Sequence, residues 1–142
     1  IWDAAPLGAP AEISGFANRR APDLFVSIHH NSSTSSALHG LETYYYTAQS
    51  IPLAKKVHAQ LARSIPIVDR GVRKAMFYVI HHTKAPAILC ELGYVSNPAE
   101  RRALQSAERQ QRAADAIANG VVDYLNSRAS VMAVPADARA LP

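Results

Sequence analysis

Short apolar runs recur along this chain, and turn-forming residues separate them. The runs at 24–29 and 87–91 are almost continuous, which predicts two buried strands, and the second run gives the stronger signal. Residues 40–46 are rich in aromatic side chains and predict another strand, while 77–80 predicts a shorter one. Between these segments, the glycine that opens 71–73 predicts a turn.

Three further segments repeat apolar residues at helical spacing. Residues 12–20 predict a short helix, and Ser50 can cap a second helix that runs to about residue 63. The sequence Asn-Pro-Ala-Glu at 97–100 resembles a helix start with proline at the first helical position, and a long helix is expected from there to about residue 126. Because strands alternate with helices, the pattern predicts an α/β domain in which helices flank a mostly parallel sheet.

The predicted domain occupies residues 12–126. Residues 1–11 are rich in proline, glycine and alanine and predict an irregular entry, whereas 127–142 has no periodicity and predicts a flexible tail. Of the 142 residues, 49% are apolar and 18% are charged, which is typical of a chain with a packed core. The single cysteine, Cys90, excludes an internal disulfide, and its position in an apolar strand predicts core packing.

The net charge of +4 is too small to identify an anionic partner. No nucleic-acid partner is expected, because no motif supports one and four arginines of the last predicted helix are explained more simply as its solvated face: Arg101, Arg102, Arg109 and Arg112. No apolar stretch is long enough to predict a transmembrane segment. The chain begins at Ile1 without a signal-peptide pattern, which predicts a processed product or a fragment.

Two of the predicted strands end on side chains that are suited to chemistry. The run at 24–29 ends on His29, and the run at 87–91 ends on Glu91. Ligands of α/β proteins bind at the ends of strands. An imidazole can ligate a metal ion, and a carboxylate can serve as a general base or acid. Together the two strand ends predict a metal hydrolase site.

Five segments, in a fixed order, resemble those of one enzyme family. They read Asp-Leu-Phe-Val-Ser-Ile-His-His-Asn at 23–31, Gly-Leu-Glu-Thr-Tyr-Tyr-Tyr at 40–46, Arg-Gly-Val-Arg at 70–73, Pro-Ala-Ile-Leu at 86–89 and Glu-Leu-Gly-Tyr-Val-Ser-Asn at 91–97. Over about residues 17–124 the chain is similar to the zinc-dependent N-acetylmuramoyl-L-alanine amidases. The resemblance implies a hydrolase of the periplasm or cell wall whose substrate is peptidoglycan. It would cleave the amide between N-acetylmuramic acid and L-alanine of the stem peptide.

The resemblance also implies roles for individual residues. His29 falls on a zinc ligand of the family, and Glu91 falls on its catalytic acid/base. Zinc bound by three protein ligands keeps one position open for water, and a glutamate can take the proton and return it to the leaving amine. Ser27 and Asn31 flank His29 and are candidates to orient it or to contact substrate, although ordinary strand and turn polarity is an equally good interpretation.

The chain departs from the family on its amino-terminal side. In the family, a Gly-His-Gly-Gly motif and a later glutamate supply further zinc ligands, and neither occurs here. Glu12 and Glu42 lie outside the expected setting, and Glu42 is expected to face a neighbour or solvent. We therefore interpret the chain as an amidase domain that lacks its first strand or strands, with an exposed sheet edge. The alternative is a non-catalytic, peptidoglycan-binding remnant of an amidase fold.

The remaining histidines are not expected to bind metal. His30 follows His29 and points to the other side of the strand. His81 and His82 are interpreted as a pair of solvated side chains, and this interpretation is preferred to one in which they contact substrate. His39 is expected in a loop, and His58 on a helix surface.

Some members of the family carry a long autoinhibitory insertion after the aromatic strand. Between Tyr46 and Gly71 this chain has room for one helix and its connections. We therefore expect no such insertion and no need for an activator to release it.

Overall fold

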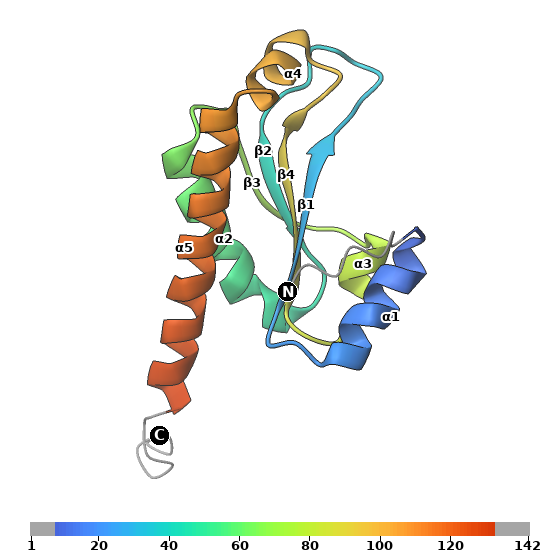
Figure 1. The fold of residues 1–142 in the computed structure, drawn as a ribbon, viewed down its shortest axis with the longest axis vertical. Helices are drawn as coiled ribbons and strands as arrows, with labels where there is room; N and C mark the ends of the chain where they lie inside the picture. The colour runs from blue at the N-terminus through green and yellow to red at the C-terminus, as the bar shows by residue number, and fades with distance from the viewer. Residues whose placement is uncertain (1–7, 133–142) are drawn as a thin grey trace.

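The computed structural model describes residues 8–132, in which helices lie on both faces of one sheet (Figure 1). On one face, α2 (Ile51–Ser64) and α5 (Ala107–Met132) pack side by side. On the other face, α1 (Pro10–Arg20) and α3 (Tyr78–His81) cover one end of the sheet. This layered arrangement confirms the predicted α/β class.

Within the described residues, four strands form the sheet: β1 (Phe25–Asn31), β2 (Leu41–Tyr45), β3 (Asp69–Lys74) and β4 (Ala87–Tyr94). Their order across the sheet is β1-β4-β2-β3. β1 pairs with β4 and β2 pairs with β3 in parallel, whereas β2 and β4 are antiparallel. The sheet is therefore mostly parallel, as predicted, and β1 and β3 are its edges.

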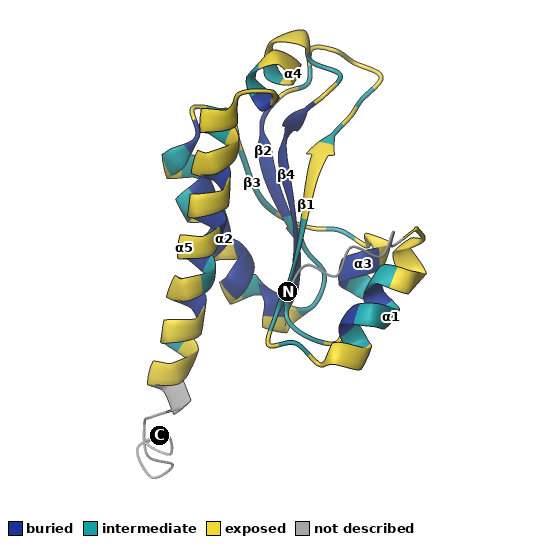
Figure 2. Ribbon diagram, in the orientation of Figure 1, coloured by how far each residue is buried: buried dark blue, intermediate teal, exposed yellow. Residues whose placement is uncertain are grey.

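The centre of the sheet is buried, whereas the β1 edge is open (Figure 2). All eight residues of β4 are buried. In β1 the three residues from Ile28 to His30 are exposed, and Ile28 leaves 55% of its surface accessible. β1 pairs with β4 on one side, and no described strand pairs with its other side. An exposed apolar side chain on such an edge strand is a feature that proteins usually cover.

Side chains of β4 alternate between the two faces of the sheet. Ile88 and Cys90 belong to the core cluster beneath α2 and α5, and burial raises the pKa of the Cys90 thiol to about 12. Ala87 and Leu89 belong to a second cluster beneath α1 and α3. Glu91 continues this second series, so its side chain lies on the face that carries α1 and α3.

Two elements differ from the expectations drawn from the sequence. Residues 71–73 lie inside β3 and not in a turn, because β3 pairs with β2 while Gly71 takes a φ of +86°. Residues 77–80 do not form a strand, because Tyr78–His81 is a helical turn that buries Val79 and Ile80 in the second cluster. A short apolar run is compatible with either element when periodicity is the evidence.

The long helix predicted after Asn97 is two helices. The Asn97 side chain accepts hydrogen bonds from two backbone N–H groups of α4 (Pro98–Leu104), as the capping pattern predicts. The chain then breaks, and the Ser106 hydroxyl accepts a hydrogen bond from the backbone N–H of Arg109 at 3.4 Å, at the start of α5. Ser106 thus provides a second helix start that the sequence interpretation missed.

The first and last helices run past the limits predicted for them. α1 begins at Pro10, two residues before the expected start, and α5 continues to Met132, so residues 127–132 of the predicted tail are helical. The rest of the predicted entry and tail, 1–7 and 133–142, lies outside the described residues. Although α5 has 26 residues, neither it nor another described helix is long and apolar enough to cross a membrane.

The helical layer depends on a close approach between α2 and α5. α2 buries Leu53, Val57 and Leu61 at helical spacing. Gly120 of α5 lies against this stripe, and a Cβ atom added there would be 2.5 Å from the Cα atom of Val57. A side chain at position 120 would therefore push the two helices apart.

We expect Gly120→Ala to lower the free energy of unfolding by about 2 kcal/mol, because overpacking of this kind costs about 1–3 kcal/mol. Gly15→Ala in α1 is the matched control, since its Cβ would meet only the flexible end of Arg19 at 3.4 Å. That control should be neutral or gain up to about 1 kcal/mol from helix propensity. Thermal unfolding followed by circular dichroism compares the two, and equal stability of both variants would contradict the close-contact assignment.

Candidate active site

Three chemically active side chains form one row across the sheet. His29 of β1 is the register partner of Glu91 in β4, and Glu42 of β2 is the partner of Glu91 from the other side. Directly opposed residues project from the same face of a sheet. The row therefore runs His29, Glu91, Glu42. It lies on the face of the sheet that carries α1 and α3, next to the end that these two helices cover.

Glu91 lies at the centre of this row and is poorly solvated. Only 7% of its surface is exposed, and its Oε2 atom has no hydrogen-bond partner among the described residues. Burial, followed by the charge of Glu42, raises the pKa of Glu91 to about 7. A buried polar atom without a partner is uncommon in proteins. Glu91 thus combines an unused oxygen with a pKa that suits proton transfer near neutrality.

Glu42 is the opposite kind of carboxylate. Its oxygens accept hydrogen bonds from Asn31 Nδ2 (3.1 Å), Tyr94 Oη (2.8 Å) and Arg70 Nε (3.0 Å), and Arg73 Nη1 lies 3.5 Å away. Burial by itself would raise the pKa of Glu42, but the hydrogen bonds from Arg70 and Tyr94 hold it below its usual value. Glu42 therefore stays ionised and is already fully engaged.

The two residues that flank His29 have different contacts. Ser27 Oγ lies 2.8 Å from His29 Nε2, so Ser27 contacts the imidazole directly. Asn31 instead donates to Glu42 from its side-chain nitrogen and accepts from the backbone N–H of Ser32. Asn31 thus lies in the network around Glu42, and no hydrogen bond joins it to His29 in the described structure.

His58 corrects one expectation from the sequence. It is 6% exposed and does not lie on the helix surface. Its Nδ1 atom is 2.9 Å from Thr43 Oγ1, and its Nε2 atom is 2.7 Å from Asp69 Oδ1. This contact holds the pKa of Asp69 below its usual value. His58 follows Val57 on the buried side of α2, which faces the sheet. Its imidazole therefore makes hydrogen bonds to two neighbouring strands, to Thr43 of β2 and to Asp69 of β3.

The other histidines lie apart from the row. His30 points to the opposite face, where it lines a small pocket with Leu92 and Arg109, and burial lowers its pKa. His39 is exposed in the loop before β2, as expected. The pair at 81–82 is engaged by aromatic rings, because His81 packs edge-on against Tyr46 and His82 stacks on Tyr78.

The row does not by itself form a metal centre. Among residues 8–132, no group of three or more His, Cys, Asp or Glu side chains is arranged to hold a metal ion. A catalytic zinc ion usually has three protein ligands. His29 is a suitable donor, but the donor set of the described residues does not fit a catalytic zinc ion on its own.

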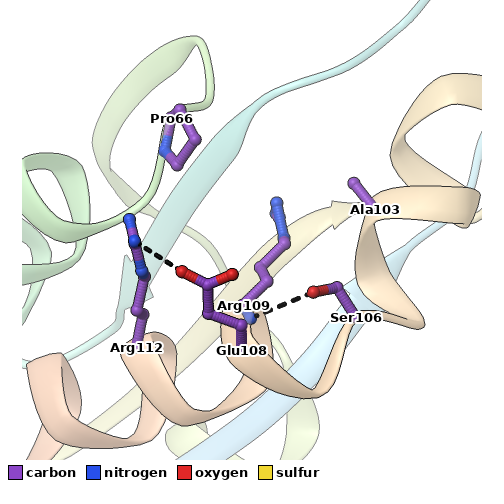
Figure 3. Close-up of a pocket in the computed structure, with 6 residues that line it drawn as sticks. All are labelled: Pro66, Ala103, Ser106, Glu108, Arg109 and Arg112. Atoms are coloured by element: carbon purple, nitrogen blue, oxygen red, sulfur yellow. Dashed lines mark hydrogen bonds and ion pairs between the residues drawn. The ribbon is translucent and has the colours of Figure 1, made fainter.

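A hollow of about 350 Å³ lies away from this row, where α4 meets α5 (Figure 3). Pro66, Ala103 and Ser106 line it together with three charged residues of α5: Glu108, Arg109 and Arg112. Glu108 and Arg112 form an exposed ion pair of 2.6 Å along the helix. None of the site residues expected from the sequence lines this hollow.

The contacts around Glu42 include residues that the sequence interpretation did not single out. In the sequence interpretation, Arg70 and Arg73 appeared only as parts of the Arg-Gly-Val-Arg segment, and Tyr94 appeared only as part of the segment at 91–97. Two arginines three positions apart gave no recognisable signal, because a regular strand would direct them to opposite faces. The structure brings both to one carboxylate.

Glu42→Ala is expected to lower the free energy of unfolding by about 2 kcal/mol or more. The variant leaves two guanidinium groups and the buried Tyr94 hydroxyl without their acceptor. Partial exposure of the arginines keeps the loss below that of a fully buried ion pair. Glu108→Ala removes an exposed carboxylate and should cost less than about 0.5 kcal/mol. Urea denaturation measures both, and similar midpoints would show that the Glu42 network is not structural.

Comparison with known proteins identifies the family. Residues 9–123 match the Amidase_3 family, N-acetylmuramoyl-L-alanine amidase. N-acetylmuramoyl-L-alanine amidase LytC from Bacillus subtilis is 42% identical over 106 residues, which cover 72% of this chain and 21% of LytC. YqiI from the same organism is 44% identical over 112 residues, which cover 76% of this chain and 54% of YqiI.

A solved structure agrees with the sequence match. The catalytic domain of CwlV, an N-acetylmuramoyl-L-alanine amidase from Bacillus (Paenibacillus) polymyxa var. colistinus, superposes with a TM-score of 0.81 and 39% identity. The superposition covers 84% of this chain and 66% of that domain. The chain thus spans about half of YqiI, a fifth of LytC and two thirds of the CwlV domain. The family match and the shared fold show that the chain belongs to the N-acetylmuramoyl-L-alanine amidases, a family of cell-wall hydrolases.

Proposed function

We propose that this chain carries part of the catalytic centre of a zinc-dependent peptidoglycan amidase. The enzyme hydrolyses the amide between N-acetylmuramic acid and L-alanine of the stem peptide. One observation carries the proposal: a buried glutamate, Glu91, presents an oxygen that has no hydrogen-bond partner within residues 8–132, and its register partner on the neighbouring strand is His29. Membership of the amidase family supplies the reaction class.

Glu91 is the proposed acid/base of this reaction. With a pKa of about 7, Glu91 is populated near neutral pH both as a carboxylate and as a carboxylic acid. The carboxylate can accept a proton from water, and the acid can then donate it to the leaving amine. Glu42 is unsuited to this task, because its oxygens are engaged by Asn31, Tyr94 and Arg70 and its pKa is held low. The two environments therefore separate a reactive carboxylate from a structural one.

Zinc dependence is proposed from the family resemblance and from the position of His29. Because the donor set of the described residues does not fit a catalytic zinc ion, we assign no step of the reaction to the metal here. We propose that His29 supplies one ligand and that polypeptide beyond these 142 residues supplies the others. The incomplete coverage of the CwlV domain supports this division, since a third of that domain has no counterpart in the superposition.

A non-catalytic role is the second candidate. A remnant that binds peptidoglycan without cutting it would need no three-ligand cluster, and the described residues contain none. Either role places the protein outside the cytoplasm, in the periplasm or cell wall, because its proposed substrate is found there. Zinc content and release of stem peptide from purified cell wall, measured on the complete gene product, separate the two roles.

Glu91→Gln in the complete gene product should lower turnover by about 10²-fold or more, because glutamine keeps the size of the side chain but cannot transfer the proton. Bound zinc should be unchanged, since Glu91 is not proposed as a ligand. The measurement is stem-peptide release from purified peptidoglycan, with Glu108→Gln as the matched control on the exposed face of α5. Near wild-type turnover of Glu91→Gln would refute the role of Glu91.

His29→Ala in the same protein should lose zinc by elemental analysis, whereas His30→Ala should retain it. Adjacent strand residues face opposite ways, and His30 lies on the side of Leu92 and Arg109. The pair is internally controlled, because each variant removes one imidazole from the same strand. Loss of zinc from His30→Ala alone would place the ligand on the other face of the sheet.

A further inference from the structure

β3 contains an irregularity that changes where its side chains point. Leu41 of β2 pairs with Asp69 of β3, but Thr43 pairs with Val72, so two steps along β2 match three steps along β3. Gly71 lies in this bulge with a φ of +86°, a conformation that favours glycine. Bulges of this kind redirect side chains and are common beside active sites.

The bulge brings two arginines to the same face. In a regular strand, residues three positions apart point to opposite sides of the sheet. Here Arg70 Nε donates to Glu42 Oε1 at 3.0 Å, and Arg73 Nη1 lies 3.5 Å from the same oxygen. Asp69 meets His58 of α2 on the other face. The extra residue therefore converts an alternating strand into one that directs two cations toward the catalytic row.

Two guanidinium groups share one carboxylate, which leaves a positive charge in excess. Arg70 is the inner group, since 27% of its side chain is exposed and its Nε atom makes the shorter contact. Arg73 is the outer group, with 49% of its side chain exposed. It donates from Nε to the Arg70 carbonyl at 3.2 Å. A guanidinium carries five N–H donors, so Arg73 keeps donors for a further acceptor.

We propose that Arg73 binds a carboxylate group of the stem peptide, and this inference rests on the proposed amidase function. Arginine pairs with carboxylates in a planar, two-point geometry that lysine cannot reproduce. Glu42 and Arg70 hold Arg73 beside the row, because Glu42 is the register partner of Glu91. The bound carboxylate then lies on the β3 side of Glu91, opposite His29 on β1. Arg73 thus favours substrates whose stem peptide carries a free carboxylate that reaches the β3 side of Glu91.

Binding can be measured without hydrolysis in the complete gene product that carries Glu91→Gln. The probes are a synthetic muramoyl-peptide with a free carboxylate on the stem and the same compound with that carboxylate amidated. Calorimetry should show that the acid binds about tenfold more tightly than the amide, as a charge-assisted pair that is half exposed would provide. The preference should shrink as salt is raised.

Arg73→Gln should abolish the preference for the acid, and Arg73→Lys should restore only part of it. Lys74→Gln is the matched control, because it removes the same charge from the next residue, which lies over the Tyr46 ring. It should keep the full preference. Equal binding of acid and amide to the Glu91→Gln protein, or loss of the preference in Lys74→Gln as much as in Arg73→Gln, would overturn the role of Arg73.

Failure of this inference is distinguishable from failure of the proposed function. If otherwise wild-type protein releases stem peptides from both probes with equal kcat/KM, the amidase function stands and the carboxylate contact is wrong. If it hydrolyses neither probe and binds neither, both proposals fall. Melting temperatures of the Arg73 variants, compared with that of Lys74→Gln, identify any loss of preference that follows from unfolding.

Discussion

The carboxylate of Glu42 joins all four strands of the sheet. It projects from β2 and accepts hydrogen bonds from Asn31 at the end of β1, from Arg70 in β3 and from Tyr94 at the end of β4. Arg73 of β3 adds an ion pair at 3.5 Å. A charge with 1% exposure is costly unless such partners surround it. These contacts hold the four strands together around Glu42, next to Glu91, which lies between β1 and β2 in the strand order.

Two glutamates on adjacent strands consequently have different chemistry. Glu42 has a full set of donors and a lowered pKa, whereas Glu91 has a raised pKa and an oxygen with no hydrogen-bond partner in the described part of the chain. The saturated carboxylate also contributes to the raised pKa of its neighbour through its charge. Stability and reactivity are therefore linked at this point of the sheet, since the charge that holds the strands together adds to the effect of burial in raising the pKa of Glu91.

Part of this arrangement could be predicted from the sequence, and the reasons are local. Two apolar runs that end in His29 and Glu91 predict two strands with these residues side by side, and the register pairs them. The expectation that both residues end their strands is wrong, because β1 continues to Asn31 and β4 to Tyr94. β3 was missed because the sequence Asp-Arg-Gly-Val-Arg-Lys is charged and contains glycine, which is typical of turns. Its strand character comes from pairing with β2 and not from its own residues. His58 was missed for a related reason, because its partners Thr43 and Asp69 are distant in sequence.

Cys90 precedes Glu91 in β4 and points to the opposite face, into the cluster beneath α2 and α5. Its thiol is fully buried, and burial raises its pKa to about 12, so the reactive thiolate is almost absent while the domain stays closed. Because the chain contains one cysteine, the thiol acts as a single built-in probe. Its rate of alkylation would report how often the helical layer separates from the sheet directly behind the proposed catalytic residue.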